Sequence, residues 1–261
     1  MAKKIGLCLG AGGARGISHI GFLQALEENN IPIDVVTGCS MGSIIGAMYL
    51  KGYSPKEMLD IALKLKKGDI IDLSMNIMRN KAILKSQKMD KLLDKYLGET
   101  DFSDLKKPFC CIATDLYSGS IIPFCEGDVK FAVRASCSIP VGFTPVPYKD
   151  MLLVDGAIRN RIPVAEARHL GADKVIAVDV LGELPETGGI HNVFTLGFRA
   201  LDILSVHINL FEEESQRPEL LLVPRLGKTS QYKVENQQFC YDRGYEIAIE
   251  NMDKIKELVK Q

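Results

Sequence analysis

A strand–glycine turn–helix unit that occurs twice in the first fifty residues constrains the fold more than any other feature of the chain. The apolar run Ile5–Leu9 stops at glycines, and from Ile17 the apolar residues recur at helical spacing. A second apolar run, at Val35 and Val36, leads through another glycine turn into the small, apolar stretch Ser43–Leu50. Strands that alternate with helices in this order favour a parallel sheet covered on both faces, so we expect an α/β fold.

The rest of the chain is expected to extend the same domain. A length of 261 residues suits one large domain with its own core, and no repeat, low-complexity tract or linker divides residues 1–261. Periodicity predicts helices over Pro55–Lys67, Ser86–Leu97, Val129–Ser136, Val164–Leu170, Val193–Ser215 and Glu235–Val259, the last broken near Gly244. Short apolar runs predict strands over Phe109–Thr114, Ser120–Phe124, Met151–Val154, Lys174–Val180 and Leu220–Val223, the first two forming a hairpin around Ser118-Gly119.

Charge and cysteine content narrow the class of protein. Lys plus Arg (32) balances Asp plus Glu (33), so nothing predicts a nucleic-acid partner. The N-terminal apolar run is too short for a signal peptide, and no stretch reaches the roughly 18 apolar residues of a membrane span. The seven cysteines lack metal-like spacing, so we expect no metal at them, and no cofactor is expected. They are interpreted as reduced, buried side chains, Cys110 and Cys111 on opposite strand faces, which favours the cytoplasm.

The pentapeptide Gly38-Cys39-Ser40-Met41-Gly42 has the form of a nucleophile turn. Glycines on either side of the serine remove Cβ atoms that would clash in a sharp strand-to-helix turn. The flanking strand and helix provide that setting, and the helix N-terminus adds a positive field beside Ser40. The alternative is a helix cap in which the Ser40 side chain only bonds a backbone N–H.

A glycine-rich loop, Gly10-Ala11-Gly12-Gly13-Ala14-Arg15-Gly16, joins the first strand to the first helix. Such a loop lets several backbone N–H groups face one point, which suits an anion or a transient oxyanion. The rival interpretation is a dinucleotide or phosphate loop. Ala14 and Arg15 spoil its register, Gly16 comes one residue late, and no acidic residue follows a second strand at the expected distance.

Asp155 comes at the end of the predicted strand Met151–Val154 and is followed by Gly156. A carboxylate at the C-terminal end of a parallel strand lies on the edge where open α/β sheets place their sites, so Asp155 and Ser40 are expected to meet there. The alternative is a turn aspartate that bonds its own backbone.

None of the four histidines follows a late strand as a catalytic triad would require. His19 lies on the first helix, where packing or capping is expected, whereas His169, His191 and His207 belong to later helices. We therefore favour a dyad in which Asp155 itself takes the serine proton. An aspartate has an ordinary pKa near 3.9, so this dyad requires burial to raise its basicity.

Taken in order, Gly12-Gly13-Ala14-Arg15-Gly16, Gly38-Cys39-Ser40-Met41-Gly42 and Asp155-Gly156-Ala157 resemble the motifs of the patatin-like phospholipase family, in its small bacterial type. The stretches around Ala113-Thr114-Asp115 and Ser138-Ile139-Pro140 are also similar, so the resemblance covers at least residues 5–165. It implies a three-layer α/β/α sandwich with a mostly parallel central sheet and a metal-free hydrolase of lipid acyl esters. One departure is Cys39, where threonine is more usual in the family.

The resemblance also implies roles for individual residues. Ser40 would attack the ester carbonyl and form an acyl-serine, Asp155 would act as base and then acid, and the N–H groups of Gly12, Gly13 and Ala14 would hold the oxyanion. Supporting roles fall to the residues beside these groups, which are Arg15, Gly16, Gly38, Gly42 and Gly156. Arg15 is open to three interpretations: orienting the loop, meeting a phosphate head group, or forming a structural ion pair.

A lipid substrate calls for an apolar path to the active site. The stretch Asp69–Leu84, with Met75 and Met78, is the candidate for transient contact with a membrane surface, against the alternative that it packs on the core. Two other functions stay open, an acyl thioesterase or acyltransferase on the same dyad and a catalytically silent binding protein. The sequence leaves head group, chain length and oligomeric state undetermined.

Overall fold

A computed structural model describes residues 3–66, 86–182, 189–207 and 216–260 of the chain. Its centre is an eight-stranded sheet in the order β5-β6-β3-β2-β1-β7-β8, with β4 paired to β3 outside this path. The strands are β1 (Ile5–Leu9), β2 (Val35–Gly38), β3 (Phe109–Asp115), β4 (Ile121–Phe124), β5 (Val146–Tyr148), β6 (Met151–Asp155), β7 (Lys174–Val178) and β8 (Leu220–Leu222).

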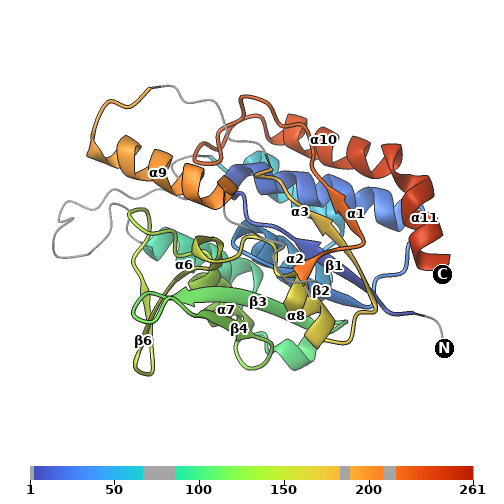
Figure 1. Cartoon of the computed structure of the whole chain (residues 1–261), viewed down its shortest axis with the longest axis horizontal. Coiled ribbons are helices and arrows are strands. Elements are labelled where there is room, and N and C mark those ends of the chain that lie inside the picture. Colours follow the sequence, from blue (N-terminus) through green and yellow to red (C-terminus); the bar gives the residue numbers. More distant parts are fainter. Residues whose placement is uncertain (1–2, 67–85, 183–188, 208–215, 261) are drawn as a thin grey trace.

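Helices surround this sheet (Figure 1). They are α1 (Ser18–Glu28), α2 (Met41–Lys51), α3 (Pro55–Lys64), α6 (Gln87–Tyr96), α7 (Val129–Ser136), α8 (Val164–His169), α9 (Val193–His207), α10 (Gln237–Glu250) and α11 (Met252–Lys260). Short 3-10 turns η1 (Gly13–Ile17), η2 (Phe102–Asp104) and η3 (Gly156–Ile158) connect them. Most predicted elements are confirmed within a few residues, although α9 is described only as far as His207.

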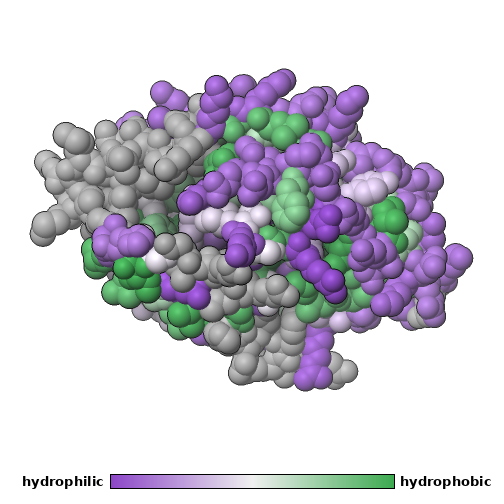
Figure 2. All heavy atoms as spheres, turned by 90° about the horizontal axis from the view of Figure 1, so that it is seen from above, coloured by the Kyte–Doolittle hydropathy of each residue, from purple (hydrophilic) through white to green (hydrophobic). Residues whose placement is uncertain are grey.

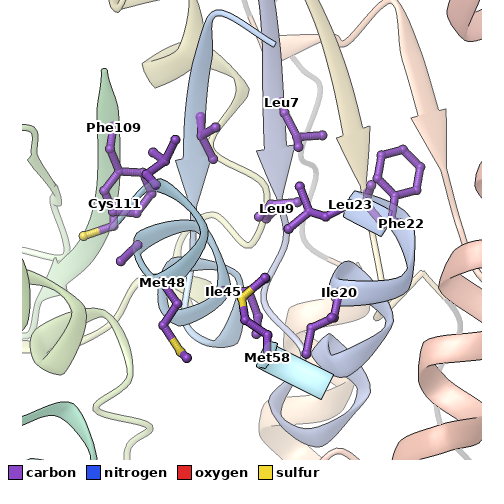
Figure 3. Packing of buried hydrophobic residues seen from close by; sticks show 14 of the residues in the cluster. Leu7, Leu9, Ile20, Phe22, Leu23, Ile45, Met48, Met58, Phe109 and Cys111 are labelled. Atoms are coloured by element: carbon purple, nitrogen blue, oxygen red, sulfur yellow. The ribbon is translucent and has the colours of Figure 1, made fainter. Parts of the chain in front are cut away.

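Alternating side chains of the strands build one core on each face of the sheet. On one face, Leu7 and Leu9 of β1 pack with residues of α1, α2 and α3, including Leu23, Ile45 and Met58 (Figure 3). On the other face, Cys8 and its neighbours on β2 and β7 pack with residues of α8. Because successive side chains of a strand point to opposite faces, the five-residue apolar run of β1 serves both cores. The expected three-layer α/β/α architecture is confirmed.

Gly244 has a different role from the predicted helix break. Helix α10 continues through Gly244 to Glu250, and the interruption falls at Asn251, between α10 and α11. A Cβ atom on Gly244 would collide with the carbonyl of Ser18, and one on Gly21 would collide with the carbonyl of Tyr241. The glycine therefore lets α10 lie directly against α1, and the prediction of a break there was wrong.

The strand directions divide the sheet into two parts. β1, β2, β3, β7 and β8 are parallel, whereas β4, β5 and β6 run antiparallel to their neighbours. The sequence did not predict β5, which includes Pro147 and follows shortly after Pro140 and Pro145. This strand pairs with β6 alone, and an edge strand tolerates Pro147 because one of its sides needs no N–H donor.

The paired cysteines correct a second expectation. Cys110 of β3 and Cys125, just after β4, form a disulfide, so the prediction that every cysteine is reduced was wrong for this pair. The hairpin register explains the pairing: Cys111 lies opposite Phe124, which places Cys110 opposite Cys125. The cysteines Cys8, Cys39, Cys111, Cys137 and Cys240 are free and buried. The cysteine content thus no longer supports a cytoplasmic location.

Two further expectations concern contact with a membrane. The predicted lipid-contact stretch Asp69–Leu84 lies outside the described residues. Within the described residues, the helices are all too short or too polar to cross a bilayer.

Candidate active site

Ser40 occupies a strained turn between β2 and α2. Its backbone has φ 51° and ψ −123°, a combination that non-glycine residues rarely adopt and that marks functional turns. The Ser40 N–H donates to Oγ of Ser136 at 2.9 Å, whereas the Ser40 side chain makes no capping hydrogen bond to α2. The capping alternative is therefore excluded, and the hydroxyl is left available for another partner.

Glycines permit this turn because other backbone lies against it. A Cβ atom on Gly42 would collide with the carbonyl of Leu9, and one on Gly38 would come within 2.6 Å of the Gly42 carbonyl. The N–H of Cys39 donates to the carbonyl of Leu9 at 3.1 Å, which fixes the turn against the end of β1. The neighbouring Cys39 side chain is fully buried, so its thiol faces the interior.

The strand that brings Asp155 to Ser40 runs in a different direction from the predicted one. β6 does not run parallel to β2; it pairs antiparallel with β3. Gly38 of β2 lies opposite Cys111 and Asp155 of β6 lies opposite Ala113, both on the side of β3 that faces away from β4. The two strands therefore lie end to end along one side of β3, and their C-terminal ends meet. The expected meeting is confirmed, but the parallel strand behind it was wrong.

Burial sets the acidity of Asp155. The residue is only 2% exposed, and burial raises the pKa of its carboxyl to about 6. Hydrogen bonds with the Ser40 hydroxyl, the Ala157 N–H and the Cys39 thiol lower the pKa again, but by less than burial raises it. The bond from Ala157, at 2.9 Å, is the one that the turn-aspartate alternative predicted, so Asp155 has both a turn contact and a serine contact.

Several amides of the glycine-rich loop anchor it to other segments, among them those of Gly10, Ala11 and Ala14, whereas the amides of Gly12 and Gly13 are left over. Ala11 N–H donates to the Arg161 carbonyl at 2.9 Å, and Ala14 N–H donates to the Gln231 carbonyl at 2.9 Å. Between them, the N–H groups of Gly12 and Gly13 meet no acceptor among the described residues. Ala14 was expected to be an oxyanion donor, but its N–H is already engaged, so the loop offers Gly12 and Gly13.

Arg15 is buried and holds a distant segment against this loop. Its guanidinium donates to the carbonyls of Thr229 at 2.7 Å, Gly227 at 2.9 Å and Val180 at 3.4 Å. At 2% exposure the side chain is out of reach of a lipid phosphate. Of the three interpretations of Arg15, the structure favours orientation of the loop.

A pocket lies over Ser40 and Asp155. Gly12 and Gly13 form part of its wall, and the rest is largely apolar, with contributions from Ala11, Ile139, Pro140, Ala157, Ile158, Leu181, Leu201, Ser205, Gln231 and Tyr232. Sequence reasoning missed Leu201 and Ser205 of α9 and the pair Gln231 and Tyr232. No local motif marks these positions, because they reach the pocket only through the packing of α9 and the segment after β8.

The described part of the chain places no histidine side chain on the pocket wall. His19 is fully buried, and its Nε2 donates to the Gly10 carbonyl at 2.8 Å. Burial lowers the pKa of His19 to about 4, so the ring is neutral at physiological pH. The predicted packing role of His19 is confirmed. The described residues also contain no group of three side chains suited to bind a metal ion.

The fold and the site together define a three-layer α/β protein with a serine at a strained strand-to-helix turn. The patatin-like phospholipase family model matches residues 7–168, more than half of the chain. The chain therefore belongs to the patatin-like phospholipase family.

Relatives of known name agree with this assignment. The mouse patatin-like phospholipase domain-containing protein 6 is 34% identical over 71% of this chain and 14% of its own length. Lysophospholipase NTE1 of the yeast Scheffersomyces stipitis is 31% identical over 68% of this chain and 12% of its own. An uncharacterised NTE family protein of Mycobacterium bovis is 34% identical over 69% of this chain and 50% of its own length. The chain thus spans at most half the length of these relatives.

Solved structures share the fold at low sequence identity. VipD of Legionella pneumophila superposes with a TM-score of 0.59 at 15% identity, covering 97% of this chain and 67% of VipD. Human GIVD cytosolic phospholipase A2 superposes with a TM-score of 0.52 at 10% identity, covering 99% of this chain and 60% of the phospholipase chain. These similarities support the architecture alone.

Proposed function

We propose that the chain is a lipid acyl hydrolase in which Ser40 is the nucleophile and Asp155 is the general base. The observation that carries the proposal is the position of Ser40 and Asp155 on the wall of one pocket, where the Ser40 hydroxyl lies beside a buried carboxyl whose pKa is raised to about 6. A base with a pKa near the working pH accepts a proton more effectively than an ordinary aspartate does.

Each step follows from the position of these groups. Asp155 takes the Ser40 proton as Oγ attacks the ester carbonyl, and the N–H groups of Gly12 and Gly13 donate to the developing oxyanion. When the tetrahedral intermediate collapses, protonated Asp155 gives its proton to the leaving alcohol and an acyl-Ser40 remains. Water activated by Asp155 then attacks this ester and releases the carboxylic acid, which restores both side chains.

The surroundings of the pocket favour a lipid as substrate. Apolar side chains of Ile139, Ile158, Leu181 and Leu201 line it. Helix α9, which contributes Leu201, also exposes four apolar side chains, namely Val193, Leu196, Ile203 and Leu204. In the surface view of Figure 2, polar residues dominate and hydrophobic residues form separate patches between them. We propose that α9 contacts the lipid surface from which the substrate is drawn.

Labelling with a fluorophosphonate probe tests the nucleophile and the base separately. We expect the parent chain to be labelled, Ser40→Ala to be unlabelled, and Asp155→Asn to be labelled at least a hundredfold more slowly. Asp115→Asn is the matched control, since Asp115 is another buried aspartate at a strand end but lies outside the pocket lining. Labelling of Ser40→Ala at the parent rate would refute the proposal.

Substrate assays separate the alternatives on the same chemistry. Release of fatty acid from phospholipid or lysophospholipid vesicles is the expected result. Turnover of acyl-thioesters alone would favour a thioesterase or acyltransferase, and labelling without turnover of either class would favour a binding protein.

A further inference from the structure

The segment 227–232, which follows β8 and lies outside the residues matched by the family model, touches the glycine-rich loop at two points. Arg15 donates to the carbonyls of Gly227 and Thr229, and the Gln231 carbonyl accepts the N–H of Ala14. A Cβ atom on Gly13, whose φ is +51°, would collide with that same carbonyl. The position of Gln231 is therefore coupled to the backbone of Gly13.

A buried carboxylate on α9 holds Gln231 in place. Oδ1 of Asp202 accepts hydrogen bonds from Nε2 of Gln231 and, at 2.6 Å, from the hydroxyl of Tyr232. The Tyr232 ring packs on Phe198 with centroids 4.6 Å apart, which leaves the Tyr232 hydroxyl directed at the carboxylate. Asp202 is 8% exposed, and Gln231 and Tyr232 both line the pocket over Ser40.

The other end of the loop is tied to the same helix. Arg161, whose carbonyl accepts Ala11 N–H, donates through its guanidinium to the carbonyls of Ser205 and Val206 on α9. The anchored amides of Ala11 and Ala14 are thus both held by residues that bond to α9. The amides of Gly12 and Gly13, which have no acceptor among the described residues, lie between them.

We infer that Asp202 is a positioning residue for the oxyanion-binding amides, acting through Gln231 on the backbone of Gly13 and Ala14. The inference deepens the proposed hydrolase function and rests on it. Donors aimed at a developing charge are effective only when they are held in place beforehand, and loss of one such donor lowers kcat about 100- to 1000-fold. Loosening the support without removing the donor should therefore lower kcat by a smaller factor.

Hydrogen exchange of backbone amides tests the coupling without reference to activity. In Asp202→Ala, Gln231 loses its side-chain anchor, so we expect the Ala14 amide to exchange at least tenfold faster than in the parent chain, with the Ala11 amide unchanged. Glu219→Ala is the matched control: Glu219 also accepts two hydrogen bonds, from Arg168 and Val175 N–H, but it lies just before β8, at the opposite end of that strand from the segment 227–232. Unchanged Ala14 exchange in Asp202→Ala would overturn the inference.

Kinetics per labelled serine then distinguish positioning from general stability. We expect Asp202→Ala to lower kcat 10- to 100-fold with KM within a factor of two, and Asp202→Asn, which keeps an acceptor oxygen, to recover most of the loss. A fall in thermal stability with parent kcat per labelled serine would contradict positioning. If Ala14 exchange responds as expected but Ser40→Ala still hydrolyses esters, the coupling stands and the proposed function fails.

Discussion

Ser40 and Asp155 follow two strands that lie end to end along the same side of β3, so their side chains meet across the gap between the strand ends. β2 pairs with β3 up to Cys111, and β6 takes over the same side of β3 from Ala113. This arrangement buries the carboxylate beside the hydroxyl without a histidine between them, and five predictions follow from it and from the neighbouring contacts.

Hydrolysis should depend on the ionisation of Asp155. The base must be deprotonated, and its pKa is raised to about 6, so kcat/KM should fall about tenfold per pH unit below pH 6 and level off above it. A pH profile on a soluble ester measures this directly. A profile that levels off already at pH 4 would show that the acidic side of the profile reports a carboxylate that is not buried, and would contradict the prediction.

Asp155→Asn should stabilise the fold while it impairs the reaction. The folded-state pKa of about 6 lies above the ordinary value near 4, so the parent chain loses stability as pH rises from about 4 to 6 and keeps the deficit above that. Removing the charge should raise the free energy of unfolding by about 2–3 kcal/mol at pH 8. Urea unfolding at pH 8 and pH 4 checks this, since the difference between variant and parent should nearly vanish at pH 4.

Gly42→Ala should disrupt the nucleophile turn. The added Cβ meets the carbonyl of Leu9, which belongs to a buried strand and cannot move aside cheaply. We expect a loss of about 2–4 kcal/mol of stability, typical of overpacking against rigid backbone, and at least a hundredfold slower labelling of Ser40. The control is Gly197→Ala on α9, where the Cβ would meet, among the described residues, a single atom of Val141 at 3.9 Å. Thermal melts of both variants should separate them clearly.

Removing one partner of the buried pair Arg161–Asp179 should be costly. Their charged groups approach to 2.8 Å with both side chains at most 6% exposed, and Arg161 also anchors the N–H of Ala11. Asp179→Ala leaves the guanidinium buried without its counter-charge, so we expect a loss of about 3–5 kcal/mol. The more exposed pair Lys130–Asp94, at a similar distance of 2.7 Å, is the comparison, because Asp94→Ala should cost less than about 1 kcal/mol. Similar losses in the two variants, measured by urea unfolding, would contradict this reasoning.

Replacing histidines should leave the reaction intact. His169 and His191 lie away from the pocket lining, and the dyad needs neither. We expect His169→Ala, His191→Ala and His207→Ala each to keep kcat within a factor of three. A loss of a hundredfold or more in any one of them would restore a triad.

Much of the site could be read from short stretches of sequence, because its chemistry is local. The strained turn at Ser40 requires glycines at Gly38 and Gly42, and that requirement is visible in five consecutive residues. The pocket wall at Gln231 and Tyr232, and its support by Asp202, could not be read in this way. Asp202 looks like any helix residue until the fold places it against Gln231.

The sequence by itself determined most of the strands, the glycine turns and the candidate reactive groups, because steric limits and hydrophobic periodicity act within a few residues. Only the tertiary structure decided which groups meet and which are already engaged. The antiparallel direction of β6, the hydrogen bond that occupies Ala14, and the pairing of Cys110 with Cys125 all depend on strand register and on contacts between distant segments. Local preferences do not encode these contacts, because burial of the whole core selects them together.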